Sequence, residues 1–224
     1  CTTCDDAGFW DLIHDAADAD LEPILRSATS SHTCSNYTSQ TTWMFTVLEK
    51  ENSEVECDYT GRTTPVTSAK PDPADMNTEH AWPQSRGSDT EPMRCDVHHL
   101  FPVDADANST RYTYPFGNVV TETWSDGGSK LGTDSKGDTV FEPRDSHKGN
   151  AARAIFYFNM RYGNVVDSWC VDEQFGTDRQ QTLSDWDLAD PPDADEIARS
   201  QDIATRMGVN NPFVVCPGLV QRMP

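Results

Sequence analysis

One segment, residues 77–119, constrains this chain more than any other part of it, because it concentrates polar chemistry between apolar anchors. It places an acid directly before a histidine, Glu79 and His80. A second cluster of acid, imidazole, amide and guanidinium groups follows: Asp96, His98, His99, Asn108 and Arg111. Such a density of titratable and hydrogen-bonding groups indicates a functional site around which the rest of the chain is organised.

Glu79 and Asn108 supply oxygen donors of the kind that hard cations prefer. One carboxylate, one amide carbonyl and several waters suit Mg²⁺ or Ca²⁺ better than Zn²⁺. Because few protein groups would hold the ion, its coordination shell keeps room for a phosphate oxygen, whose charge the ion would neutralise. These residues therefore predict a Mg²⁺ site, with Ca²⁺ or Mn²⁺ as alternatives.

His80 is the candidate for proton transfer. In a strand, adjacent side chains point to opposite faces, so a local bend must bring Glu79 and His80 to one site. An imidazole with an ordinary pKa of about 6.5 accepts a proton from water at neutral pH. We predict that His80 is a general base, although a Glu-His pair taken alone is usually two unrelated residues.

The CxxHH pattern formed by Cys95, His98 and His99 has two interpretations. These side chains would suit a structural zinc site, but a second half of such a site is missing from the sequence. We favour hydrogen bonding within the protein. Asp96, His98 and His99 are therefore predicted to support the site structurally.

The charge of the chain limits its partners. Acidic residues outnumber basic residues by 37 to 17, which gives a formal net charge of -20. Such a surface repels polyanions at long range and stays hydrated. Adaptation to a salty medium explains this composition, because salt screens the mutual repulsion of the acids. Binding of cations or of basic partners is the alternative explanation.

The cysteines indicate the compartment. Seven of them are scattered along the chain, at positions 1, 4, 34, 57, 95, 170 and 216. Scattered cysteines in a polar chain favour disulfides and export, and the odd count leaves one thiol over. Cys1 is either the lipid-bearing residue of a lipoprotein or the place where the chain was cut. No apolar run reaches a membrane-spanning length and no signal peptide remains, so we expect a mature exported form.

Local patterns predict the secondary structure in outline. Apolar spacing predicts helices at residues 10–26, with a kink or break at Pro23, and at residues 41–51. A third helix is expected within 141–163, capped by Asp145 or Ser146 and ended by Gly163. Turn and strand formers predict a strand or loop at 58–65, a loop at 70–75, and an exposed loop or hairpin tip at 126–138. The acidic region 171–202 is expected to be a solvated face, with one helix at 194–207.

Three long segments of the chain resemble the endonuclease I family of secreted or periplasmic bacterial nucleases. They read NTEHAWPQS, CDVHHLFPVDADANSTRYTYPFGNV and FEPRDSHKGNAARAIFYFNMRY. They occur in the family's order and approximate spacing, and with the upstream DYTGR they span residues 58–163. The N-terminal helices and the acidic C-terminal third are similar to the family only in general terms.

The resemblance implies a fold and a set of residue roles. The expected fold is α+β, mixed and mainly helical, with a small antiparallel sheet and a ββα-metal (His-Me finger) active site. We expect a single nuclease domain over residues 1–224. By resemblance, Glu79 in EHAWP and Asn108 in ANSTR are metal ligands and His80 is the general base. Arg111 in the NSxR element, and Arg94 just before Cys95, are candidates for phosphate contact.

The resemblance also implies an activity. The family cleaves DNA and often RNA with little sequence preference, and leaves 5′-phosphate and 3′-hydroxyl ends. The expectation for this chain is an exported, monomeric endonuclease with DNA as substrate and RNA as an alternative substrate. Its charge departs from the usual basic surface, so we expect salt to raise its activity. The competing interpretation is a non-catalytic exported module that binds Ca²⁺ through its acidic surface or is stabilised by zinc.

Overall fold

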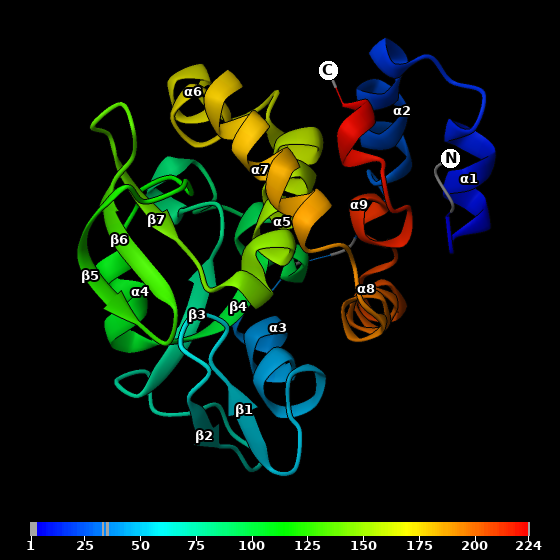
Figure 1. The fold of residues 1–224 in the computed structure, drawn as a ribbon. Coiled ribbons are helices and arrows are strands. Elements are labelled where there is room, and N and C mark those ends of the chain that lie inside the picture. Colours follow the sequence, from blue (N-terminus) through cyan, green and yellow to red (C-terminus); the bar gives the residue numbers. More distant parts are fainter. Residues whose placement is uncertain (1–3, 33, 35, 224) are drawn as a thin grey trace.

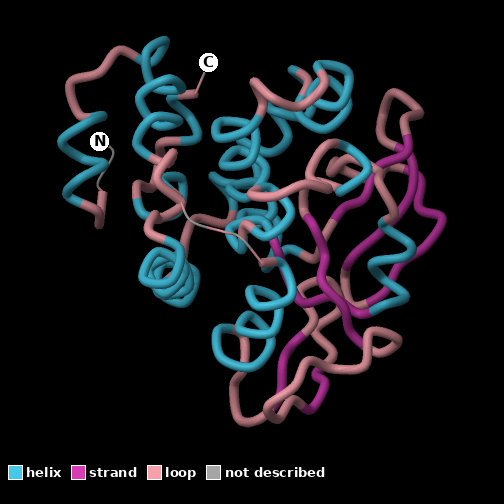
Figure 2. The backbone as a smooth tube through the Cα atoms, turned by 180° about the vertical axis from the view of Figure 1, so that it is seen from behind, coloured by secondary structure: helices cyan, strands magenta, loops and turns pink. Residues whose placement is uncertain are grey.

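The strands of the protein form three small antiparallel sheets on one side, and most helices lie on the other (Figures 1 and 2). The computed structural model describes residues 4–32, 34 and 36–223. The strands are β1 Glu54–Glu56, β2 Thr63–Pro65, β3 Met76–His80, β4 Leu100–Asp104, β5 Thr121–Asp126, β6 Ser129–Thr133 and β7 Thr139–Glu142. The sheets are β1-β2, β3-β4 and β5-β6-β7. The predicted α+β class is confirmed, with the strands divided among three sheets.

The helices surround one long central helix, α5. Their bounds are α1 Ala7–Ile13, α2 Leu21–Ala28, α3 Tyr37–Trp43, α4 Ala105–Arg111, α5 Asp145–Tyr162, α6 Ser168–Phe175, α7 Thr177–Ala189, α8 Ala194–Met207 and α9 Pro212–Val215. Figure 1 shows α5 between the strands and the C-terminal helices. It is buried nearly all round, as expected of a helix that is enclosed by its neighbours.

A buried ion network fixes α5 against α7 and α8. The Arg153 guanidinium, fully buried, donates to Asp187 Oδ1 at 2.8 Å and to Glu196 Oε1 at 2.8 Å. Gly149 lets the helix approach its neighbour, since a Cβ there would lie 1.9 Å from the Asp190 carbonyl oxygen. Breaking such a network by removing one partner would leave an uncompensated buried charge.

The N-terminal helix prediction was wrong in one respect. Residues 10–26 do not form one helix, but parts of α1 and α2 joined by a short 3₁₀ turn at Asp18–Asp20. Pro23 lies in the first turn of α2. A proline is tolerated there because its missing N–H has no intrahelical acceptor.

The structure corrects other local predictions. The helix expected at 41–51 begins at Tyr37 and ends in a π-helical turn, Met44–Leu48. The region 126–138, expected to be an exposed loop or hairpin tip, contains two hairpin turns with strand β6 between them. Helix α5 has Arg144 at its N-cap without a side-chain cap, so the predicted caps Asp145 and Ser146 were wrong, while Gly163 ends the helix as predicted. The acidic region 171–202 contains most of α6, all of α7 and the first part of α8, whereas only one helix was predicted there. That helix is α8, and its predicted bounds are confirmed.

Two disulfides confirm part of the cysteine prediction. Cys4 is bonded to Cys216 and Cys34 to Cys95, whereas Cys57 and Cys170 are free and buried. The expectations about Cys1 lie outside the described residues. In the part of the chain that the structure describes, no helix has the length and apolar character needed to cross a membrane.

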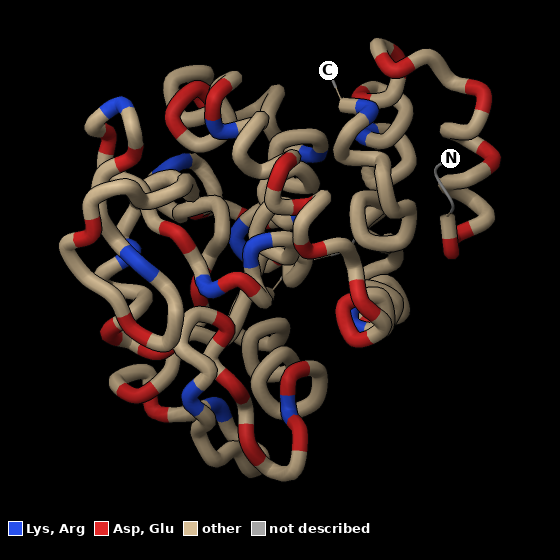
Figure 3. The backbone as a smooth tube through the Cα atoms, viewed as in Figure 1, with Lys and Arg blue, Asp and Glu red and all other residues tan. Residues whose placement is uncertain are grey.

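Acidic positions are spread over most elements of the protein, and basic positions are few (Figure 3). Most arginines are neutralised locally by carboxylates. Examples are Arg62 with Asp104 and Asp126, Arg179 with Asp134, and Arg199 with Glu49. Paired arginines offer little charge to a polyanion, so the location of any unpaired one matters for function.

Candidate active site

Strands β3 and β4 and helix α4 assemble the candidate site. The strands pair antiparallel, with Glu79 opposite Phe101 and His80 opposite Leu100. Helix α4 begins directly after β4 and packs on both strands. This places Asn108 of α4 beside Asn77 and Thr78 of β3. The arrangement is a ββα unit.

Asn108 is held against β3 by its amide nitrogen. Nδ2 donates to Asn77 Oδ1 at 2.6 Å and lies 3.4 Å from the carbonyl oxygen of Thr78, the residue before Glu79. An amide has donors only on its nitrogen and acceptors only on its oxygen. The amide nitrogen of Asn108 is hydrogen-bonded to β3. Its side-chain carbonyl oxygen is therefore available to bind a cation.

Glu79 is a buried carboxylate that is held on one side only. It is 2% exposed, and its Oε1 accepts a hydrogen bond from the Tyr59 hydroxyl at 2.8 Å and lies 3.3 Å from Arg111 Nη1. No described side chain forms a hydrogen bond with Oε2. Burial raises the pKa of Glu79, against the opposing effect of Arg111. A buried carboxylate whose side-chain contacts are all on Oε1 is a suitable ligand for a hard divalent ion.

Arg111 lies in the core rather than on the surface. It is 1% exposed, donates to the carbonyl oxygens of His80 at 3.3 Å and Ala81 at 2.7 Å, and stacks over Phe116. Its contacts therefore connect Glu79 to the end of β3. This position suits a residue that orients Glu79.

His80 presents one ring nitrogen as an acceptor. Its Nε2 lies 3.1 Å from the carbonyl oxygen of Arg94, which can only accept, so Nε2 carries the proton of the neutral ring. The lone pair is then on Nδ1, where the Gln84 side-chain amide donates at 3.3 Å. Burial, followed by the charges of His99 and Arg94, lowers the pKa of His80 to about 3. The imidazole is neutral at pH 7 and able to take a proton.

Arg94 is the exception among the arginines. In the described part of the chain, it is the one arginine whose guanidinium makes no hydrogen bond and no ion pair, and its buried Nε lacks a partner. The guanidinium lies 4.5 Å over the Tyr37 ring, which itself stacks on His80 with ring centroids 5.6 Å apart. A cation held beside His80 with unused donors is suited to bind an anion.

Asp96, His98 and His99 all make hydrogen bonds inside the protein. Asp96 accepts from the Tyr157 and Tyr162 hydroxyls at 2.9 and 2.7 Å. His98 Nε2 bonds the Val209 carbonyl and His99 Nε2 bonds the Met93 carbonyl. Burial lowers the pKa of His98 to about 4, so the ring is neutral. These contacts are those of supporting residues.

The zinc interpretation fails on Cys95. Its sulfur is bonded to Cys34 and supplies no thiolate. Within the described ranges, the one close group of three metal-type ligands is Cys34, Glu91 and Cys95, which contains this same disulfide. A structural zinc site built on the CxxHH pattern is therefore excluded.

Three residues of the site were not predicted from the sequence. Tyr59 binds Glu79, Gln84 binds His80, and Tyr37 lies between His80 and Arg94. Tyr59 belongs to the DYTGR motif, which was a usable signal. Gln84 follows His80 by four residues, and Tyr37 lies on the distant helix α3. No local sequence pattern marks either residue as part of the site.

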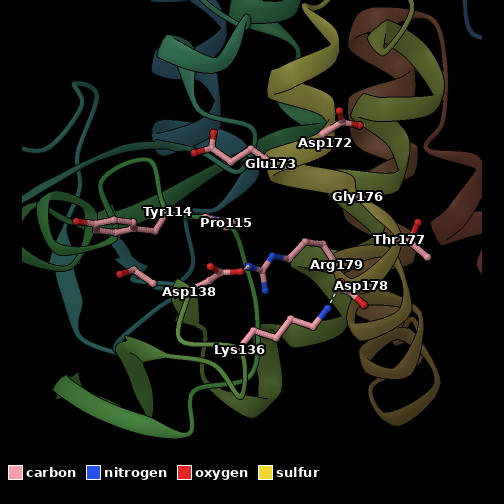
Figure 4. A pocket seen from close by; sticks show the side chains of 11 residues that line it. Tyr114, Pro115, Lys136, Asp138, Asp172, Glu173, Gly176, Thr177, Asp178 and Arg179 are labelled. Atoms are coloured by element: carbon pink, nitrogen blue, oxygen red, sulfur yellow. Dashed lines mark hydrogen bonds and ion pairs between the residues drawn. The ribbon is translucent and has the colours of Figure 1, made fainter.

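A surface pocket of about 460 Å³ lies between the β6-β7 turn and the α6-α7 junction (Figure 4). Glu79, His80 and Asn108 do not line it. Its two basic residues are paired, Lys136 with Asp178 and Arg179 with Asp134 and Asp138. Asp172 and Glu173 add further negative charge. This acidic pocket is poorly suited to a phosphate group.

Comparison with known proteins gives an independent result. The family model described as Endonuclease I matches residues 12–218. Two similar proteins are named extracellular ribonuclease, one from Bacillus subtilis (strain 168) and one from Bacillus amyloliquefaciens. Each is 32% identical over 154 residues, covering 64% of this chain and 52% of the relative. The chain thus spans about half the length of the curated relatives it matches.

Proposed function

The chain belongs to the endonuclease I family, and we propose that it is an exported, metal-dependent endonuclease without sequence preference. Residues 1–224 act in this proposal as a single monomeric nuclease domain, with the active-site core at 58–163. The observation that carries the proposal is the neutral His80, with Nδ1 as acceptor, which follows Glu79 directly in β3 and bonds the carbonyl of the unpaired Arg94, while Asn108 is held against the same strand at Thr78.

The proposed mechanism assigns one task to each side chain. The Glu79 carboxylate and the Asn108 carbonyl would hold Mg²⁺, or alternatively Mn²⁺ or Ca²⁺, which when bound neutralises charge on the phosphodiester. His80 Nδ1 removes a proton from the water that attacks phosphorus, while the Arg94 carbonyl stabilises the resulting imidazolium through Nε2. The bond between phosphorus and the 3′-oxygen breaks, and the leaving 3′-oxygen takes a proton from solvent water. Arg94 binds a phosphate oxygen. Arg111, with Tyr59, orients Glu79.

We propose that the substrate is DNA, with RNA as an alternative substrate, and that cleavage leaves 5′-phosphate and 3′-hydroxyl ends. Two relatives that share the matched region are named extracellular ribonucleases. Their names support both RNA as a substrate and export. The two disulfides support export independently, because disulfides persist in oxidising compartments.

Metal removal tests the proposed function directly. We expect the protein to nick supercoiled plasmid DNA in Mg²⁺, to lose this activity in excess EDTA, and to regain it when Mg²⁺ is restored. Gel electrophoresis of the plasmid measures the outcome. Nicking that continues unchanged in EDTA would exclude the proposed metal site. A complete absence of cleavage of DNA and RNA in every divalent metal would favour the non-catalytic acidic module instead.

Replacing Arg94 should reduce catalysis strongly. Loss of one charged donor to a reacting phosphate costs about 10²-fold in kcat, by analogy with oxyanion donors. Arg94→Ala is expected to show this loss, and Arg94→Lys to recover part of it. Arg206→Ala is the matched control, because Arg206 also stacks on an aromatic ring, that of Trp43, but lies on α8. Equal kcat/KM for Arg94→Ala and the control would remove Arg94 from the mechanism.

The salt response should be inverted relative to a basic nuclease. Binding to nucleic acid normally weakens as salt rises, because counterions released into a more concentrated salt solution gain less entropy. Here the net charge of -20 repels the substrate at long range, and salt screens that repulsion. We propose that the protein is salt-adapted and that its activity increases from low to moderate NaCl. An activity titration that falls steadily from the lowest salt concentration would contradict this.

A further inference from the structure

Two exposed aromatic residues lie near the proposed active site: Tyr112 follows α4 directly, and Trp169 lies on α6, which contacts the segment after Tyr112. The Tyr112 side chain is 67% exposed and that of Trp169 is 54% exposed. Exposed aromatic rings offer stacking surfaces for nucleobases. We call Tyr112, Trp169 and the Arg86 side chain that lies over the Trp169 ring the aromatic platform.

Trp169 is fixed in orientation by Arg86. The Arg86 guanidinium lies 5.1 Å from the centroid of the Trp169 ring and is ion-paired with Glu173. Arg86 lies six residues after His80. The carbonyl oxygen of Arg86 accepts a hydrogen bond from the Trp82 indole at 2.7 Å. One face of the Trp169 indole is therefore covered by a cation, and its exposed area remains for a ligand.

Tyr112 comes directly from the metal-binding helix. Its N–H donates to the carbonyl oxygen of Asn108 at 3.0 Å, at the end of α4. Its backbone φ is +52°, a conformation that costs a non-glycine residue about 1–3 kcal/mol and often accompanies functional sites. The Tyr112 ring lies 5.8 Å from the ring of Tyr114, which marks one edge of the acidic pocket (Figure 4).

Two contacts join the two sides of the platform. The Gln174 side chain on α6 donates to the carbonyl oxygen of Thr113 at 3.1 Å, which ties the helix carrying Trp169 to the segment carrying Tyr112. Glu173, the residue before Gln174 on α6, is hydrogen-bonded to Arg86 and raises the pKa of its guanidinium. The segments that carry Tyr112, Trp169 and Arg86 therefore contact one another.

The charges around the aromatic platform favour contacts with nucleobases over contacts with phosphates. Arg86 is neutralised by Glu173, and Asp172 adds negative charge nearby, so this surface gives little attraction to phosphates. Nucleobases are neutral and stack on aromatic faces, which strengthens binding by about tenfold per base. In a duplex the bases are already stacked on one another and are not available.

We propose that Tyr112 and Trp169 bind unpaired bases of single-stranded nucleic acid next to the phosphate that is cleaved. The inference rests on the proposed function, because it places the platform beside the catalytic residues of a nuclease. It gives this acidic protein a source of affinity that does not depend on basic residues. It also makes single-stranded nucleic acid the preferred substrate class.

Binding to strands with and without bases tests the proposal. The probes are a fluorescent oligothymidylate, the matching oligouridylate, and an abasic strand of the same length and charge. In the cleavage-deficient His80→Ala background with EDTA, fluorescence anisotropy should show about tenfold or greater preference for either base-bearing strand. Adding Tyr112→Ala or Trp169→Ala should reduce this preference by about tenfold, whereas Leu188→Ala, at another exposed apolar residue on α7, should retain it. Equal affinity for all three strands would overturn the proposal.

Kinetics separates this inference from the proposed function. In the otherwise wild-type enzyme, Tyr112→Ala and Trp169→Ala should raise KM for single strands about tenfold while KM for duplex DNA changes less than about twofold. A wild type that cuts nucleic acid but shows no such difference retains its function and loses the platform. A protein that distinguishes thymidylate from the abasic strand but cuts neither retains the platform and loses the proposed function.

Discussion

The His80→Ala variant should lose about 10²–10⁴-fold in kcat, the contribution expected of a general base. Its free energy of unfolding should change by no more than about 2 kcal/mol, because the ring makes only a few hydrogen bonds. Plasmid cleavage rates and thermal unfolding measure the two effects. His14→Ala serves as a control, since His14 is exposed on the distant helix α1. A His80→Ala variant that cuts plasmid at the wild-type rate would disprove the mechanism.

The pH dependence of the wild type adds a second readout for His80. Buried and uncharged, the ring has a pKa of about 3 in the free protein. As pH falls, kcat/KM should therefore remain level well below pH 6.5, where an ordinary histidine becomes protonated. A bound phosphate brings negative charge that favours the imidazolium, so the acid limb of kcat should lie at higher pH than that of kcat/KM. An acid limb of kcat/KM centred near 6.5 would show that another, exposed group is the base.

The Glu79→Ala variant should lose both activity and stability. Removing the carboxylate takes away a proposed metal ligand, and leaves the buried Arg111 charge without its partner, at a cost of about 3–5 kcal/mol. Glu79→Gln keeps an oxygen that can accept from Tyr59 and should be less destabilised, although it lacks the negative charge that holds the ion. Urea unfolding and calorimetric titration with Mg²⁺ measure these effects separately.

Comparing the two Glu79 variants distinguishes the two roles of this residue. If Glu79→Gln binds Mg²⁺ and cleaves plasmid as the wild type does, Glu79 is a structural partner of Arg111 and not a metal ligand. If both variants lose Mg²⁺ binding but differ in stability, the carboxylate serves the ion and the core together.

The sequence predicted the centre of the fold better than its periphery. The resemblance of segment 77–119 to the endonuclease I family implied a ββα unit, and this segment does contain the paired strands β3 and β4 followed by helix α4. Helices α6 and α7 were missed because their exposed faces are acidic and few of their residues are buried. The break between α1 and α2 was missed because apolar periodicity continues across it.

Long-range contacts explain what the sequence left open at the site. Arg94 is unpaired only because no carboxylate folds onto it, and Tyr37 reaches it from α3, far away along the chain. Arg111 looks like any other candidate for phosphate binding until its burial and its contact with Glu79 are known. Pairing between distant residues has no local signature, so these roles required the three-dimensional structure.

The hydrogen bonds that most arginines make within the protein affect how such an enzyme would degrade a long nucleic acid. Within the described part of the chain, every arginine but Arg94 donates hydrogen bonds to groups of the protein itself, so few are available to follow a phosphate backbone. Sliding along nucleic acid depends on many such contacts. Without them the enzyme would dissociate after each cut and return at random. Its digestion would be distributive, shortening all molecules in a population together rather than consuming them one at a time.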